Sequence, residues 1–459
     1  MIGMNYTKMY EALQKVLKDE QISTVMSTQR TDLVELWGQI YSGDAPWLNK
    51  ETENAGVAAS VSAEVARLIT IELDSCIDGS PMAEQLNQIY QKVIGKLRVQ
   101  IEYALAKGSM IFKPYMTDKG LAIQYLQADD FFPLDFDGEE ITRCAFLDQF
   151  RSGNAIYTRI EIHSIKDGTL HIKNRAFVSK NDGVLGSEIN LADVDKWAVL
   201  KEEDAFPGCS KLPFGYFVVP IGNTADSKSP LGASTFSRAL PKLLRADKLY
   251  SQIGWEYESK ETAVHIADSL LQHDSQSRKP IYPEGHERLY RAFEYDAGIN
   301  DKPLMDVFSP EIRDAAYFNA WNQLMRQIEF DCFLAYGTLS DPNNTDKTAT
   351  EIESSKQRSY SYVHSCQEAL QKALEDLVDA MAFWCQVYDT IQAGELHMHF
   401  AWDDSIIVDK EQERQTARAD IAMGAMSVIE YRMRYYGENE EEAAAAIAKI
   451  STSDDGVMK

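Results

Sequence analysis

Two histidines in the C-terminal part of the chain have a spacing that could support metal chemistry. His397 and His399 lie in the segment 395–400, and on a β-strand this spacing places both imidazoles on one face. Imidazole is a common ligand of Zn²⁺ and other transition metals. With Asp403 and Asp404 close by, the pattern would suit an acidic metal-dependent phosphodiesterase. A third ligand at a recognisable spacing is missing, so a solvated strand face is the favoured interpretation and no metal site is predicted.

The other residues able to do chemistry are better explained as sheet or turn residues. His163 and His171 fall on a predicted pair of strands, where imidazoles also serve packing and solubility. The remaining candidates sit where turns are expected, because Asp and Gly are good turn formers: Asp129, Asp130, Asp135, Asp137 and Gly138. None of these sets assembles a nucleophile, a base and an orienting group.

The sequence contains near matches to two known catalytic motifs, and neither match is complete. Gly95-Lys96 is the nearest match to a phosphate-binding P-loop, but Tyr90 occupies the position of its first glycine. The segment 232–234 is the nearest match to the nucleophile elbow of a hydrolase, but Phe236 replaces its second glycine. We therefore expect a protein that is not an enzyme and needs no cofactor.

The net charge of the chain disfavours one class of function. The 459 residues include 71 acidic and 46 basic side chains, for a formal net charge of −25. A protein that binds nucleic acid by neutralising phosphates is disfavoured, because such proteins carry clustered positive charge.

The length suggests roughly three domains. No apolar run reaches the roughly 18 residues of a membrane span, and no leader is predicted.

The cysteines lack the C-x-x-C spacing of zinc knuckles and redox motifs. We expect reduced, mostly buried thiols and a cytosol-like environment. The six are Cys76, Cys144, Cys209, Cys332, Cys366 and Cys385.

The first half of the chain changes from helical to strand periodicity. Helices are predicted over 6–41, 58–76 and 81–108. A β-rich module follows over 109–219, with a hairpin turn at Asp167-Gly168. A polar linker over 223–230 ends this half.

The second half is mainly helical, so the predicted fold class is α+β. A helix over 234–261 contains Pro241, which predicts a kink or a fresh helical start. A small α/β excursion over 262–308 follows. The next helix, 309–336, opens with Ser309-Pro310-Glu311, which combines a capping residue with a first-turn proline and acid.

A polar loop over 337–347 then precedes the longest predicted helix. Thr348 and Glu351 form a capping box that opens a helix over 348–391, about 65 Å long. Its apolar stripe recurs in steps of three and four, at Val363, Cys366, Leu370, Ala373, Leu377, Met381 and Trp384. A strand-like segment over 395–408 and helices over 409–450 complete the chain.

One basic stripe stands out in this acidic sequence. Arg238, Lys242, Arg245 and Lys248 follow at offsets of 0, 4, 7 and 10, which places them on one helix face. The stripe could be solvated or could pair with carboxylates of a neighbouring chain. Alternatively, it could contact a nucleic-acid backbone or a surrounding shell protein.

Four short segments are characteristic in their sequence and in their order along the chain: 128–133 (ADDFFP), 229–234 (SPLGAS), 346–351 (DKTATE) and 403–411 (DDSIIVDKE). With these segments and in this order of parts, the chain resembles the portal proteins of tailed bacteriophages, in the lineage common among siphophages of Gram-positive hosts. The resemblance covers nearly the whole chain.

The resemblance implies a mainly helical portal fold that assembles into a homo-oligomeric ring, usually of twelve subunits, around a DNA channel. Its modules would be a wing (1–230), a first stem helix (231–261), a clip (262–308), a second stem helix (309–336), a tunnel loop (337–347), a long helix with a returning wing strand (348–408) and a crown (409–459). The ring would be assembled in the host cytoplasm and occupy the portal vertex of the virion.

The resemblance also implies partners and contact residues. The partners would be double-stranded DNA in transit, the terminase large subunit, head–tail connector or adaptor proteins, and the major capsid and scaffolding proteins. The tunnel loop would present Ser340, Asp341, Asn343, Asn344, Asp346 and Lys347 to DNA. The clip would present His273, Gln276, Arg278, Lys279 and Glu284 to the motor and connector. The basic stripe would meet the next subunit. A different head–tail connector ring protein is an alternative, although such adaptors are usually much shorter.

Overall fold

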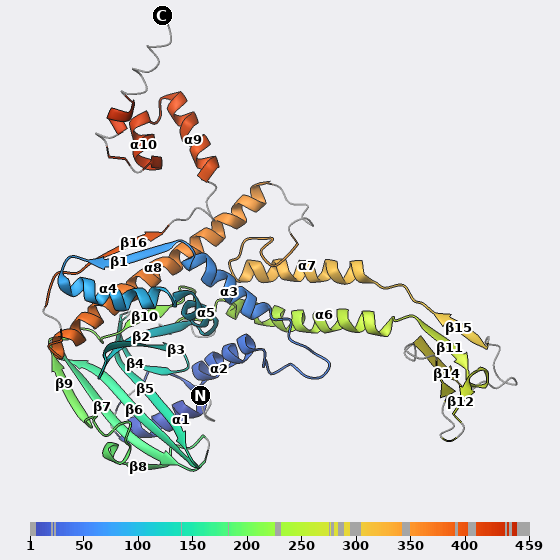
Figure 1. Cartoon of the computed structure of the whole chain (residues 1–459), viewed down its shortest axis with the longest axis horizontal. Coiled ribbons are helices and arrows are strands. Elements are labelled where there is room, and N and C mark those ends of the chain that lie inside the picture. Colours follow the sequence, from blue (N-terminus) through green and yellow to red (C-terminus); the bar gives the residue numbers. More distant parts are fainter. Residues whose placement is uncertain are drawn as a thin grey trace, which may run out of the picture. The chain divides into compact units, whose positions relative to one another are not determined.

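The structure is a computed structural model (Figure 1) with a mixed α+β fold. It describes residues 6–19, 22, 24–138, 140–181, 183–224, 231–274, 276, 280–282, 289–293, 304–341, 349–390, 393–402, 410–436, 438–439 and 443–447. The chain divides into two compact units, one made of 1–71 and 75–400 and the other of 72–74 and 401–459. Within the described residues, no helix is long and apolar enough to cross a membrane.

Five helices lie in the N-terminal part of the first unit: α1 (Tyr6–Asp19), α2 (Thr28–Ser42), α3 (Val57–Thr70), α4 (Pro81–Ile94) and α5 (Leu97–Lys107). The single helix predicted over 6–41 is therefore two. Ser27 starts the second by accepting a hydrogen bond from the backbone N–H of Arg30. Val25 instead bonds to the carbonyl of Leu134, so the sequence between the helices contributes to the packing of the β-module.

The helices predicted over 58–76 and 81–108 are also shorter than expected. After α3 the chain enters a strand, β1 (Leu73–Asp78), which pairs with the distant β16 (His397–Trp402). This long-range pairing overrides the local helical pattern. The second helix breaks at Gly95 and Lys96, where glycine is unfavourable in a helix interior.

The β-rich module is confirmed and contains two sheets. The larger has the order β4-β5-β6-β7-β8, with β9 also pairing with β7, and the smaller has the order β10-β2-β3. Their strands are β2 (Ser109–Thr117), β3 (Gly120–Gln127), β4 (Phe131–Asp137), β5 (Glu140–Ser152), β6 (Ala155–Lys166), β7 (Thr169–Ser179), β8 (Ser187–Ile189), β9 (Glu203–Pro207) and β10 (Gly215–Val218). The predicted hairpin turn joins β6 to β7, with Asp167 at φ 50° and Gly168 at φ 71°.

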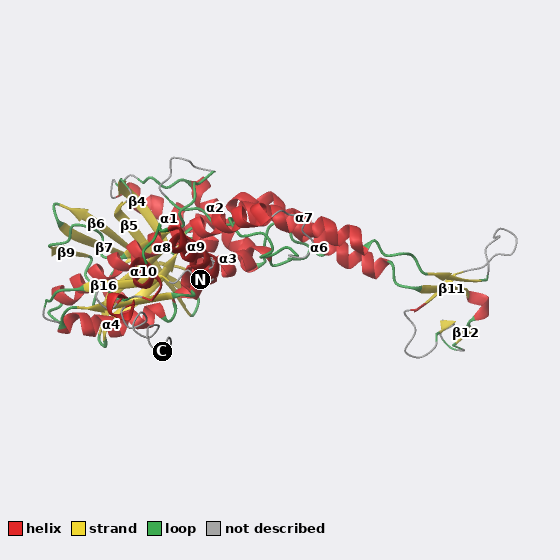
Figure 2. Ribbon diagram, turned by 90° about the horizontal axis from the view of Figure 1, so that it is seen from above, coloured by secondary structure: helices red, strands yellow, loops and turns green. Residues whose placement is uncertain are grey.

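The second half contains two helices that run side by side (Figures 1 and 2): α6 (Leu240–Ser259) and α7 (Asp314–Asp331). Pro241 is the second residue of α6, so it marks a fresh start rather than a kink. Between the helices lies a small sheet of order β14-β11-β15, together with the pair β12-β13. These strands are β11 (Ala263–Ala267), β12 (Gln272–His273), β13 (Pro280–Ile281), β14 (Tyr290–Phe293) and β15 (Met305–Phe308).

Helix α7 begins later than Ser309-Pro310-Glu311 predicts, and it ends at Asp331. The start shifts because a buried carboxylate captures the preceding segment. Glu256 of α6 accepts hydrogen bonds from the backbone N–H of Arg313 and, bidentately, from its guanidinium. These bonds hold the pKa of Glu256 at about 2. The contact fixes where the chain enters α7.

The predicted long helix is confirmed as α8 (Ala349–Val387), whose 39 residues span about 58 Å. All seven residues of its predicted apolar stripe are buried. Trp384 belongs to the core cluster between the two sheets that also includes Phe131, Phe146 and Phe214. The six cysteines are free thiols, and all but Cys76 are buried.

The second unit contains α9 (Lys410–Met423) and α10 (Val428–Tyr436), which agree with the helical pattern predicted there. Arg418 donates to the hydroxyl of Tyr431 across the two helices at 3.3 Å. Arg432 forms a bidentate ion pair with Glu438.

The segment 231–234 packs tightly against α2 and the end of α5. It belongs to one of the four segments that carry the resemblance. All four residues are buried, and the carbonyl oxygen of Gly232 accepts a hydrogen bond from Arg30. The backbone of Gly232 lies against that of Gly108, at the end of α5. Residues 225–230 lie outside the described part.

Candidate functional site

The histidines of β16 do not form a metal centre with other described residues. His399 Nε2 lies 3.1 Å from Asp78 Oδ2, and His397 Nε2 lies 3.8 Å from Glu395 Oε2, with all four side chains exposed. Within the described ranges, no group of three or more His, Cys, Asp or Glu side chains is placed to hold a metal ion. Asp403 and Asp404 lie outside these ranges.

His163 belongs to a buried charge network between the two sheets, whereas His171 is exposed. Glu161 of β6 accepts from His163 Nε2 at 2.5 Å and from Lys113 Nζ at 2.7 Å, and it pairs with Arg159 at 2.9 Å. Burial opposes the charge of Glu161, but these partners outweigh it and hold its pKa well below the usual value. Burial lowers the pKa of His163, although Glu161 acts in the opposite direction.

This network predicts a pH-dependent stability. Below about pH 6.5 the unfolded chain binds a proton at this histidine more readily than the folded chain does. The contribution of His163 to stability should therefore be complete above pH 6.5 and decline as the pH falls through 6.5 toward the folded pKa, by at most about 1.4 kcal/mol per pH unit. Urea unfolding at pH 7.5 and 5.5 measures this loss. His163→Gln, which has no imidazole to titrate, should lose less, and equal losses would contradict the assignment.

Two of the four acidic turn candidates are confirmed as turn residues. Asp129 and Asp130 lie in the turn between β3 and β4, where the N–H of Asp130 bonds to the carbonyl of Gln127. Burial raises the pKa of Asp130 to about 6. Asp135 and Asp137 belong to strand β4 instead, and the turn follows at Gly138, with φ 64°. Here the pairing of β4 with β5 extends the strand beyond the local turn signal.

The basic stripe divides into two parts along α6. Near its start, the guanidinium of Arg238 lies over the ring of Phe333 at 5.1 Å, and Lys242 pairs with Asp331 at 2.5 Å. Further along, Arg245 and Lys248 are exposed, and neither has a carboxylate partner among the described residues. The first part therefore stabilises the α6–α7 contact, and the second is available for an outside partner.

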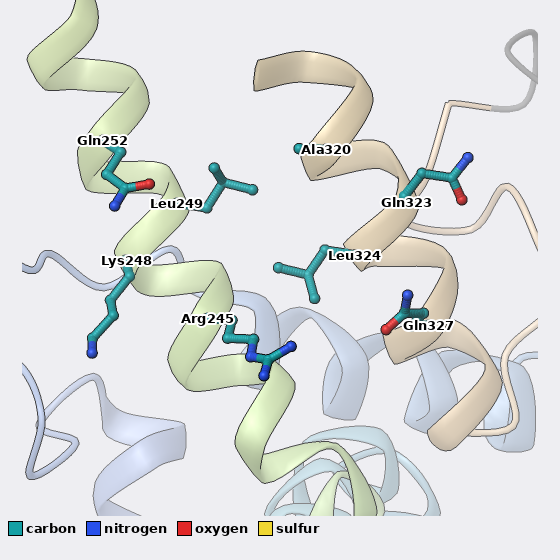
Figure 3. Close-up of a pocket in the computed structure, with 8 residues that line it drawn as sticks. All are labelled: Arg245, Lys248, Leu249, Gln252, Ala320, Gln323, Leu324 and Gln327. Carbon is teal, nitrogen blue, oxygen red and sulfur yellow. The ribbon is translucent and has the colours of Figure 1, made fainter. Parts of the chain in front are cut away.

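Helix α7 lies beside the second part of the stripe, and the two helices form a groove that the sequence analysis did not predict (Figure 3). Leu249 of α6 and Leu324 of α7 face one another, and the groove has a volume of about 420 Å³. Its other lining residues are Arg245, Lys248, Gln252, Ala320, Gln323 and Gln327. A neighbouring groove of about 350 Å³ is lined by Lys242, Gln323, Arg326, Gln327, Phe330 and Tyr336. None of the described lining residues is acidic, which favours an anionic partner.

Exposed apolar side chains are concentrated in the part of the chain that contains α6 and α7. Half of the large apolar side chains that are exposed among the described residues lie between 250 and 330. Trp255 of α6 is 66% exposed, and on α7 Phe318 and Phe330 are each more than half exposed. Every residue of β15 is exposed. This concentration makes α6, α7 and the small sheet between them the candidate interaction surface.

The predicted DNA-facing and clip residues are only partly described. Ser340 is buried and Asp341 is exposed, and both lie at the start of the polar loop. Asn343, Asn344, Asp346 and Lys347 lie outside the described residues. In the predicted clip, His273 bonds to Asp268 at 3.0 Å, and Gln276 donates its backbone N–H to Asp274. Arg278, Lys279 and Glu284 are outside the described part.

Comparison with known proteins gives no family assignment. No model of a protein family matches the chain, and no curated protein matches it in sequence.

Proposed function

We propose that the protein is the portal subunit of a tailed bacteriophage, a ring-forming conduit through which the genome is packaged and ejected. The ordered resemblance of its segments to portal proteins is the basis of the proposal. The succession of α6, a small sheet, α7, a polar loop and the 39-residue α8 agrees with the stem, clip, tunnel loop and long helix that the resemblance implies.

The structural observation that supports the proposal most strongly is the apolar surface that α6 and α7 leave exposed. Its apolar side chains are poorly suited to bulk water, and a second copy of the chain would cover them together with the exposed cations beside them. Because the grooves are basic and the chain is strongly acidic, each copy can offer a carboxylate-bearing surface to the next. A contact between two different surfaces repeats around a ring when its rotation closes.

The net charge of −25 supports a passive conduit. An acidic wall repels DNA phosphates and keeps the duplex away from strong local binding sites. The polar loop would then touch DNA weakly, with Asp341 and Asp346 repelling the phosphates and Lys347 attracting them. This role needs no catalysis and no cofactor.

The remaining partners follow from the same proposal. The segment 262–308 would meet the terminase large subunit during packaging and the head–tail connector proteins afterwards. The N-terminal β-module and the α6–α7 pair would lie in the capsid vertex beside the major capsid and scaffolding proteins. A shorter adaptor ring is the alternative, which the length of 459 residues disfavours.

The mass of the purified protein in solution tests the proposal. We expect a multiple of the chain mass, close to twelve copies, by native mass spectrometry or light scattering. A stable monomer at every concentration would contradict it.

The polar loop yields a separate prediction. Deleting 343–346 should leave ring assembly intact, because the proposed subunit contacts lie on α6 and α7. The DNA content of capsids assembled with the deleted chain should fall several-fold. Loss of the ring itself would show that the loop is a subunit contact.

A further inference from the structure

Glu329 of α7 is a carboxylate that the fold buries completely, with an exposed fraction of 0%. Its Oε1 accepts the backbone N–H groups of Leu339 at 2.6 Å and Ser340 at 2.8 Å. Its Oε2 accepts the hydroxyl of Ser340 at 2.8 Å. These three hydrogen bonds attach the segment 339–340 to α7.

A second buried residue of α7 extends this attachment. Asn322 lies two turns before Glu329 and is also buried. Its Oδ1 accepts the backbone N–H of Asp341 at 2.7 Å. The chain therefore runs back along α7 from Leu339 to Asp341, and both anchors lie on the face of α7 that also buries Met325.

A side chain of helix α8 also binds the turn that directly follows α7. Arg358 donates to the carbonyl of Leu334 at 3.1 Å. Its guanidinium also lies over the rings of Phe330 at 4.5 Å and Tyr336 at 5.3 Å. The chain between α7 and residue 341 is thus fixed by side chains of both helices.

We infer that Glu329 is a positioning residue that makes α7 and the segment 339–341 move as one body. It sets the direction in which the chain leaves α7 toward the polar loop. This inference rests on the proposed function for its consequence, because in a DNA conduit a displacement of α7 would reach the base of the DNA-facing loop directly. The attachment itself depends only on the observed bonds.

Hydrogen exchange of Glu329→Met tests the attachment. Methionine has a similar length but no oxygen, so it removes the acceptor of both backbone N–H groups and of the Ser340 hydroxyl. We expect the amides of Leu339 and Ser340 to exchange about tenfold faster or more, with the α8 amides unchanged. Glu258→Met, at an exposed position of α6, is the matched control and should change neither. Unchanged exchange at 339 and 340 in Glu329→Met would overturn the inference.

Ser340→Ala keeps the inference testable if Glu329→Met fails to fold. It removes one donor to Glu329 and the acceptor of the Gly337 N–H, which lies 3.2 Å from the Ser340 hydroxyl. Exchange should rise several-fold at Gly337, while Leu339 and Ser340 stay protected by the carboxylate. Loss of protection at all three positions would show that Glu329 does not hold the segment by itself and would overturn the inference.

The functional consequence is read separately from ring assembly. Rings of Glu329→Met should form, and capsids built with them should contain several-fold less DNA. Faster exchange at residues 339 and 340 together with a normal DNA content would overturn the positioning role and leave the portal proposal standing. Absence of rings in the unmodified protein would overturn the portal proposal and leave the exchange result valid.

Discussion

Replacing Gly232 by alanine is expected to destabilise the protein by about 3 kcal/mol, a large share of the roughly 5–15 kcal/mol that separates a folded domain from its unfolded state. A Cβ at this position would overlap the carbonyl oxygen of Gly108 and lie 2.7 Å from Val218 Cγ2 and 3.0 Å from the backbone nitrogen of Val219. Two of these three contacts are backbone atoms, so no side-chain rotation relieves the overlap. Thermal and urea unfolding measure the loss.

Gly254→Ala is the matched control. Gly254 lies inside α6, and an added Cβ there would have no atom within 4 Å, so alanine removes only the entropic penalty of glycine in a helix. We expect a gain of about 0.5–1 kcal/mol. Equal stability of Gly232→Ala and the unmodified protein would show that the junction between Gly232 and Gly108 is not tightly packed.

Reversing the charges of Arg245 and Lys248 is expected to abolish ring assembly while leaving the fold intact. Both side chains are exposed and lack a carboxylate partner among the described residues, so the double change to glutamate costs little within one chain. In the proposed ring each reversal places like charges together at every subunit contact, which costs several kcal/mol. Native mass spectrometry should find mainly monomers, with the subunit affinity lowered about 100-fold or more.

The control carries the same change in net charge at a distant place. Lys119 lies in the turn between β2 and β3, and Lys166 is exposed at the β6–β7 hairpin. Reversing both to glutamate should leave the rings intact. Rings in the Arg245 and Lys248 variant would show that the basic stripe is not the subunit contact.

Local periodicity predicted the parts of the fold that local forces determine. The apolar stripe of α8 is correct at every position because a helix stripe needs only the 3.6-residue repeat. The hairpin at Asp167-Gly168 is likewise encoded by its two turn residues. Only the end of the helix predicted over 58–76 was wrong, because β1 pairs with β16, more than 300 residues further along the chain.

The candidate surface was predicted only in part, for the same reason. The basic stripe follows from spacing along one helix, but the grooves need α7, which lies about 70 residues further along the chain. Glu329 was not foreseen, because an acid on a helix is ordinarily solvated. The available signal was its spacing, since Glu329 follows Met325 by four residues and therefore shares its buried face.

Electron microscopy of the purified protein tests the central claim most directly. Many copies of the chain should form circular particles with a central opening, and class averages should show rotational symmetry near twelvefold. Micrographs containing only compact particles without an opening would contradict the proposal that this acidic protein conducts a genome.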